Sequence, residues 1–197
     1  MLNTLPFELI LASASPRRKL FLEELAIPFS VEVREIDETF PSHLKGKEIA
    51  AYIAEQKACA FNDLETNQVV LTGDTVVWNE HHALGKPSNQ QQAFEMIQSL
   101  SGKTHEVISA FCLKGKNFCR TKVDACRVHF KSLTEEEINY YIENFQPFDK
   151  AGAYGIQEWI GQIGIDKIEG SFYTVMGMPV HLLYQELVEL KTNWKYK

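Results

Sequence analysis

The stretch that decides the fold is residues 9–20, which read Leu9-Ile10-Leu11-Ala12-Ser13-Ala14-Ser15-Pro16-Arg17-Arg18-Lys19-Leu20. The apolar start predicts a short buried strand, and the serines that follow are typical of turns and helix caps. Pro16 suits the first position of a helix, where its missing N–H costs nothing. Arg17 and Arg18 then fall near the positive end of the helix dipole, where cations are unfavourable. Free backbone N–H groups, serine hydroxyls and guanidinium groups together predict a polyphosphate site; the alternative is a solvated basic turn.

The composition is that of an ordinary globular protein. A chain of 197 residues with 45% hydrophobic residues can bury a core, and we expect a single domain over residues 1–197, with at most two joined lobes. The net charge of −6 disfavours nucleic acid as a partner. The sequence has neither an apolar run of the roughly 20 residues that cross a membrane nor a signal-peptide pattern, so we expect a cytoplasmic protein. The four cysteines form no Cys-x-x-Cys pair, which favours structural thiols over a zinc site.

Hydrophobic periodicity predicts helices that alternate with strands. Strands are expected near 8–12, 28–34, 69–78 (interrupted at 72–75), 105–113, 118–130 and 172–175. Helices are expected near 16–26, 46–63, 88–100, after Thr134, and near 179–190, with a glycine-punctuated region over 147–170. This alternation, with one central hairpin, predicts a mixed α/β sheet, in one domain or in two lobes that share a groove.

Four charged residues are candidates for chemistry. Asp74 lies within an apolar strand, where a carboxylate is costly unless a metal or a lysine pairs with it. Lys57 falls on the apolar stripe of its helix, so it either extends to solvent or points into an internal polar site. Lys86 lies in a glycine-proline turn that, taken alone, is typical of exposed surface. Glu38 could complete a divalent-metal site with Asp74, because Mg²⁺ prefers carboxylates together with phosphate oxygens, although alone it is typical of a surface acid.

A second glycine-containing segment carries the last candidate. Residues 149–157 read Asp149-Lys150-Ala151-Gly152-Ala153-Tyr154-Gly155-Ile156-Gln157. The Gln157 amide has both a donor and an acceptor, which suits the edge of a nucleobase. A plain glycine-rich connector is an equally good interpretation.

Six segments in chain order, residues 13–18, 73–77, 85–87, 101–105, 149–157 and 170–179, together resemble the Maf family of nucleoside triphosphate pyrophosphatases. The resemblance spans nearly the whole chain. It implies a mixed α/β, inosine-triphosphatase-like fold with two lobes around a central cleft. It also implies hydrolysis of a nucleoside triphosphate to its monophosphate and diphosphate with a divalent metal, Mg²⁺ or Mn²⁺. A homodimer is expected on resemblance alone.

The resemblance gives catalytic roles to the charged residues. Asp74 matches the family's catalytic acid, which acts as the base that activates water. The residues alone, not the resemblance, suggest that Glu38 helps Asp74 to hold the metal. The cations on the phosphate side are matched by Arg18, Lys57 and Lys86. The expected reaction is an in-line attack of water on the α-phosphorus, with diphosphate as the leaving group.

The resemblance also gives binding roles. Ser13 and Ser15 belong to the first motif, at the expected nucleotide site. The positions associated with base choice are matched by Arg17, Thr75 and Gln157, and these residue types are those of the subgroup that acts on dTTP and UTP. Glu158 departs from the pattern, because the family usually has glycine there; this difference either changes the local loop geometry or adds a carboxylate near the base. Alternatives are the same chemistry on modified nucleotides, and a nucleotide-binding regulator of septation that does not hydrolyse its ligand.

Overall fold

The computed structural model describes residues 1–194, which divide into two compact units. The first unit comprises residues 1–74, 109–124 and those from Gly177 onward, and the second comprises residues 75–108 and 125–176. Residues 195–197 of the predicted domain lie outside the described part of the chain. The organisation as one domain with a central cleft stays a prediction.

The strands of residues 1–194 form a seven-stranded mixed sheet. They are β1 (Glu8–Leu11), β2 (Ser30–Val31), β3 (Gln68–Asn79), β4 (His82–Leu84), β5 (Thr104–Lys114), β6 (Cys119–Phe130) and β7 (Ile165–Glu169). Their order is β2-β1-β3-β5-β6-β7, with β4 paired to β3. β1 is parallel to β2 and β3, whereas β4 and β7 are antiparallel to their neighbours. The predicted mixed α/β class is therefore confirmed.

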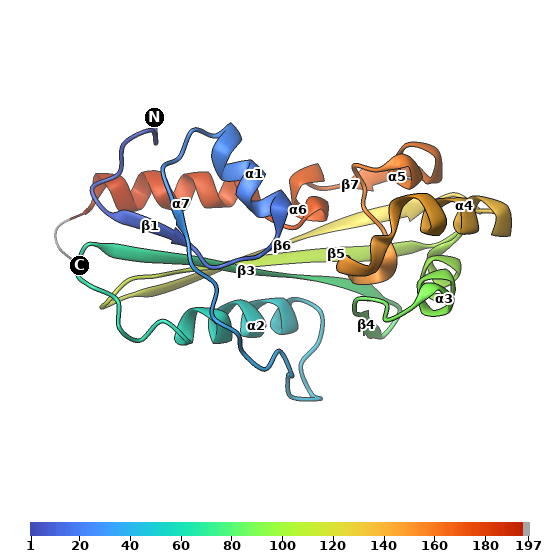
Figure 1. The fold of residues 1–197 in the computed structure, drawn as a ribbon, viewed down its shortest axis with the longest axis horizontal. Coiled ribbons are helices and arrows are strands. Elements are labelled where there is room, and N and C mark those ends of the chain that lie inside the picture. Colours follow the sequence, from blue (N-terminus) through green and yellow to red (C-terminus); the bar gives the residue numbers. More distant parts are fainter. Residues whose placement is uncertain (195–197) are drawn as a thin grey trace. The chain divides into compact units, whose positions relative to one another are not determined.

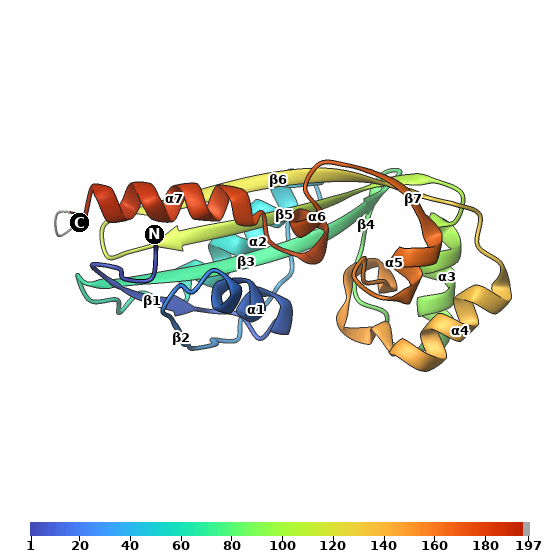
Figure 2. The ribbon, with the colours of Figure 1, turned by 90° about the horizontal axis from the view of Figure 1, so that it is seen from above.

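Three helices cover the sheet in the first unit: α1 (Pro16–Glu24), α2 (Lys47–Cys59) and α7 (Val180–Thr192). Figures 1 and 2 show α1 and α7 on one face of this part of the sheet and α2 on the other. One cluster of its core joins β1 and β3 to the chain after α2, through Ile10, Ala12, Phe61, Leu64 and Val70. Burying a strand of this kind from both faces explains the nearly continuous apolar run in β3.

The second unit has its own hydrophobic core, built by α3 (Gln90–Leu100), α4 (Glu135–Phe145), α5 (Trp159–Gly164), α6 (Phe172–Met176) and two 3₁₀ turns, η1 (Pro147–Asp149) and η2 (Ala151–Ala153). α3 packs against α4 and η2. α4 begins with a capping box, in which the Thr134 hydroxyl accepts from the Glu137 N–H and the Glu137 carboxylate accepts from the Thr134 N–H.

Two sequence predictions are wrong here. β3 is not interrupted at residues 72–75, because Thr72 donates its hydroxyl proton to the Ala54 carbonyl at 2.6 Å and the backbone stays extended. The expected strand at 172–175 is the short helix α6, since Thr174 and Val175 donate their N–H groups back to the Ser171 carbonyl. The strand of this region is instead β7, which pairs with β6.

Among residues 1–194, no helix combines the length and the apolar character needed to cross a membrane.

Candidate active site

Arg18 joins three separate segments of the first unit. Its Nη1 donates to Ser13 Oγ at 3.2 Å and to the Gly73 carbonyl at 2.9 Å, and its Nε donates to the Gly177 carbonyl at 3.0 Å. Ser15 is the N-cap residue of α1, and its own N–H donates to Ser13 Oγ at 3.2 Å. Burial lowers the pKa of Arg18 from its ordinary value, and the Asp74 charge opposes that effect. A guanidinium stays protonated even so, and it is a fixed positive charge here.

Gly73 makes this approach of Arg18 possible. A Cβ at this position would lie 2.9 Å from the Ala110 carbonyl oxygen and 3.3 Å from Arg18 Nε. A hydrogen in place of a side chain lets β3 contact its neighbouring strand and the guanidinium at once. The residue beside Asp74 thus decides whether the cation can reach the centre of the strand.

Lys57 brings two carboxylates together. Its Nζ lies 3.0 Å from Asp74 Oδ1 and 3.1 Å from Glu38 Oε1. The Lys57 side chain is 17% exposed, that of Asp74 13% and that of Glu38 53%. Asp74 is therefore a nearly buried carboxylate that depends on its cation, whereas Glu38 approaches the same ammonium from the solvent side.

The environment of Asp74 changes its proton affinity. Burial raises the pKa of Asp74, the charges of Lys57 and Arg18 oppose the rise, and the Glu38 charge adds to it. The net direction is upward. A carboxylate with a raised pKa is a stronger base, which suits the removal of a proton from water near neutral pH.

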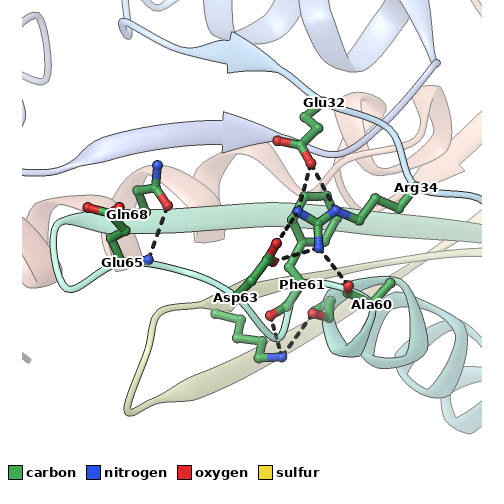
Figure 3. Close-up of polar contacts among 9 residues, drawn as sticks. Glu32, Arg34, Ala60, Phe61, Asp63, Glu65 and Gln68 are labelled. Atoms are coloured by element: carbon green, nitrogen blue, oxygen red, sulfur yellow. Dashed lines mark hydrogen bonds and ion pairs between the residues drawn. The ribbon is translucent and has the colours of Figure 1, made fainter.

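The end of the helix that carries Lys57 is held by a second polar cluster, shown in Figure 3. Arg34 pairs with Asp63 at 2.7 Å and with Glu32 at 2.8 Å, and its guanidinium lies 4.2 Å from the centre of the Phe61 ring. It also donates to the Ala60 carbonyl, while Lys114 donates to the carbonyls of Ala58 and Phe61. These bonds satisfy the carbonyls at the C-terminal end of α2, so the cluster stabilises the helix.

Asp74 and Glu38 fit a divalent cation. Their oxygens already converge on a positive group, the Lys57 ammonium, and carboxylate oxygens are the donors that Mg²⁺ prefers. Within residues 1–194 no group of three or more His, Cys, Asp or Glu side chains could hold a metal unaided. A cation here would need phosphate or water oxygens in addition.

Three further predicted residues belong to the second unit. Thr75 follows Asp74 on β3 and is half-buried, Lys86 is exposed in the loop after β4, and Gln157 is half-buried just before α5. The Lys86 loop is tied to the glycine-containing loop, because the Gly152 N–H donates to the Gly85 carbonyl at 3.0 Å. In the first unit the structure brings together Asp74, the cations Lys57 and Arg18, and the acid Glu38. A common site for these residues and those of the second unit stays a prediction, as does the role of the half-buried Arg17.

Three residues of the second unit were not among the predicted site residues. Glu158 receives the hydroxyl proton of Tyr141 and lies 3.1 Å from Lys150 Nζ, and Lys150 also pairs with Asp149 at 2.7 Å. Lys150 is buried although it is charged. Tyr141 sits on the apolar stripe of α4 with Ile138 and Ile142, and its polar tip in that stripe was a signal that it has a partner.

Comparison with known proteins gives the fold and the family of the chain. The fold is that of a mixed α/β protein similar to a solved HAM1 protein from Coxiella burnetii, with a TM-score of 0.50, 16% identity, and coverage of 93% of this chain and 99% of that one. This likeness confirms the predicted inosine-triphosphatase-like fold. A family model described as "Maf-like protein" matches residues 8–190, so the chain belongs to the Maf family.

Curated relatives share a name. A "dTTP/UTP pyrophosphatase" of Christiangramia forsetii is 52% identical over 93% of this chain and 94% of its own length. Proteins with the same name from Flavobacterium johnsoniae and Bacteroides fragilis are 46% and 44% identical, each over 93% of this chain. They cover 95% and 96% of their own lengths, so the similarity extends over almost the entire proteins.

Proposed function

We propose that this protein is a nucleoside triphosphate pyrophosphatase that converts dTTP and UTP to the nucleoside monophosphate and diphosphate. The observation that carries the proposal is the nearly buried Asp74, with its raised pKa, paired with Lys57 in a chain of this family. A protein that only binds a nucleotide needs no base of this kind beside cations. The names of the curated relatives support the substrates.

Asp74 is the residue that accepts the proton. Water attacks the α-phosphorus in line with the departing diphosphate, the new phosphorus–oxygen bond forms as the bond to the bridging oxygen breaks, and the water proton passes to Asp74. General base catalysis by such a group contributes roughly 10²–10⁴-fold. Arg18 and Lys57 stabilise the negative charge on the phosphoryl oxygens, which is expected to be the larger contribution.

Asp74 and Glu38 are the residues that would hold a divalent cation, Mg²⁺ or Mn²⁺. When bound, such a cation polarises phosphoryl oxygens and neutralises their charge. Lys57, which lies between the two carboxylates, keeps them close together before the cation and the nucleotide arrive.

The other residues keep the roles that the sequence predicts. Lys86 neutralises phosphate charge, Ser13 and Ser15 belong to the nucleotide-binding turn, and the base is selected by Arg17, Thr75 and Gln157. A cytoplasmic location and a homodimer are proposed with them.

The test is a substrate panel with product analysis. The protein is incubated with Mg²⁺ and each of dTTP, UTP, CTP, ATP and GTP, together with modified pyrimidine and purine triphosphates. Chromatography then separates mono-, di- and triphosphates, and diphosphate is measured directly. We expect dTTP and UTP to give monophosphate and diphosphate. Preferred turnover of a modified nucleotide would replace dTTP and UTP as the proposed substrates. Nucleotide binding without any release of diphosphate would refute the proposed enzymatic activity.

A further inference from the structure

The loop between η2 and α5 folds its own side chains back on its backbone. A Cβ at Gly155 would lie 2.9 Å from Gln157 Nε2 and also 2.9 Å from Glu158 Oε2. A side chain at this point would therefore displace the end of the Gln157 or the Glu158 side chain. The two side chains lie next to each other, and Gln157 is one of the three residues proposed above to select the base.

Glu158 is fixed from three directions. Tyr141 donates its hydroxyl proton to Oε2, Lys150 Nζ lies 3.1 Å from Oε1, and Gln157 Nε2 donates to Oε1 at 3.4 Å. The side chains of Glu158 and Lys150 are only 19% and 9% exposed, so their charges rely on each other.

Tyr141 is fixed in turn. Its hydroxyl oxygen accepts the Gly155 N–H at 3.0 Å, so that the hydroxyl proton is directed to the carboxylate. Burial and the neighbouring Glu158 raise the pKa of Tyr141, which keeps it a donor at any ordinary pH. The carboxylate of Glu158 therefore has one orientation, set by a neutral phenol and a lysine.

This orientation decides how the Gln157 amide points. A carboxylate can only accept hydrogen bonds, whereas a carboxamide has an NH₂ donor and a C=O acceptor. Gln157 must turn its NH₂ group to Glu158, and its Oε1 is then the group that it presents to a ligand. An acceptor matches the N3–H of uracil and thymine, and it opposes the N3 lone pair of cytosine.

We propose that Glu158 is a positioning residue that fixes the Gln157 carboxamide with its oxygen toward the base, and that this pair selects pyrimidines with an N3–H over cytosine. The inference rests on the proposed function, and within it on contact between Gln157 and the base. A polar group that is held in place and left without a partner by the wrong base discriminates far more strongly than a change of shape.

The experiment measures kcat/KM for UTP and for CTP in the wild type and in Glu158→Gln. The substituted amide has the same shape, but it can offer either C=O or NH₂ to Gln157, so Gln157 can turn over and accept cytosine. We expect the UTP:CTP ratio to fall about tenfold, the value of one matched hydrogen bond. A purely structural loss of active enzyme lowers both values equally and leaves the ratio unchanged.

Asp149→Asn is the matched control, because it removes the same charge from the other partner of Lys150 while Glu158 and Gln157 are left unchanged. We expect its UTP:CTP ratio to equal that of the wild type. Tyr141→Phe keeps the Glu158 carboxylate but removes the hydrogen bond to its Oε2, so it should lower the UTP:CTP ratio less than Glu158→Gln does. If Glu158→Gln does not fold, Tyr141→Phe is tested in its place. An unchanged ratio in Glu158→Gln, or in Tyr141→Phe in that case, refutes the inference, as does an equal fall in Asp149→Asn. If the wild type hydrolyses UTP but the variants leave the UTP:CTP ratio unchanged, the inference fails and the proposed function stands. If the wild type releases no diphosphate, both the inference and the proposed function fail.

Discussion

Replacing Lys57 with methionine separates the charge of the candidate site from its shape. Methionine has a similar length, but it leaves the nearly buried Asp74 carboxylate without the ammonium 3.0 Å away. Removing one partner of a buried ion pair costs about 3–5 kcal/mol. The pair with Glu38 adds little, because that side chain is 53% exposed and screened by solvent. Since Arg18 still lies near Asp74, we expect a loss at the low end, about 3 kcal/mol at pH 7.

The loss should depend on pH in a defined direction. Burial already holds the pKa of Asp74 above its ordinary value, and removing Lys57 raises it further. A folded-state pKa above the unfolded one means that the folded state binds the proton more tightly. Stability is therefore lost as the pH rises through the folded-state pKa and recovered as it falls. The difference between wild type and Lys57→Met should be largest above neutrality and should shrink on acidification.

The assay is urea unfolding followed by circular dichroism at several pH values, which gives the free energy of unfolding. In a thermal scan, a loss of about 3 kcal/mol corresponds to a decrease of roughly 6–12 °C in Tm. Lys47→Met, an exposed position on the same helix, is the matched control and should change stability by less than about 0.5 kcal/mol. In an Asp74→Asn background the cost of Lys57→Met should fall to about 1 kcal/mol or less. A cost that is the same at every pH, or the same with and without Asp74, would refute the reasoning.

Further predictions follow from the same contacts. Asp74→Asn should lower kcat for UTP by roughly 10²–10⁴-fold while UTP binding, measured by calorimetry, persists. Gly73→Ala should cost about 1–3 kcal/mol in urea unfolding, because its Cβ would lie 2.9 Å from the Ala110 carbonyl oxygen. A chelator should abolish diphosphate release, with recovery on added Mg²⁺, and Glu38→Gln should raise the Mg²⁺ concentration that gives half-maximal release. Turnover that persists in the presence of the chelator would contradict the proposed requirement for a divalent cation.

The sequence predicted the centre of the first unit well because its signals are local. The apolar spacing of Ile49 and Ile53 predicted Lys57 on the apolar stripe of its helix. The apolar runs on both sides of Asp74 predicted a carboxylate among buried strand residues, although the expected interruption at residues 72–75 is wrong. A buried charge needs a partner, so Asp74 was expected near a metal or a lysine. The structure has Lys57 as that partner, with its Nζ 3.0 Å from Asp74 Oδ1.

The second unit was harder to predict because its polar contacts do not involve a charge within an apolar run. Tyr141 and Glu158 are 17 residues apart, the same separation as Lys57 and Asp74, but the neutral phenol in the apolar stripe of α4 does not indicate which group it contacts. Residues 172–176 have the aromatic and β-branched types that favour strands, but backbone bonds to the Ser171 carbonyl turn them into a helix.

The most direct test of the account follows the oxygen of water into the product. UTP is hydrolysed in heavy-oxygen water by the wild type and by Asp74→Asn, and the monophosphate and diphosphate are examined by mass spectrometry. Attack on the α-phosphorus puts the heavy oxygen into the monophosphate alone. Labelled monophosphate should form more slowly in Asp74→Asn than in the wild type. Heavy oxygen in the diphosphate, or an unchanged rate in Asp74→Asn, would contradict the account.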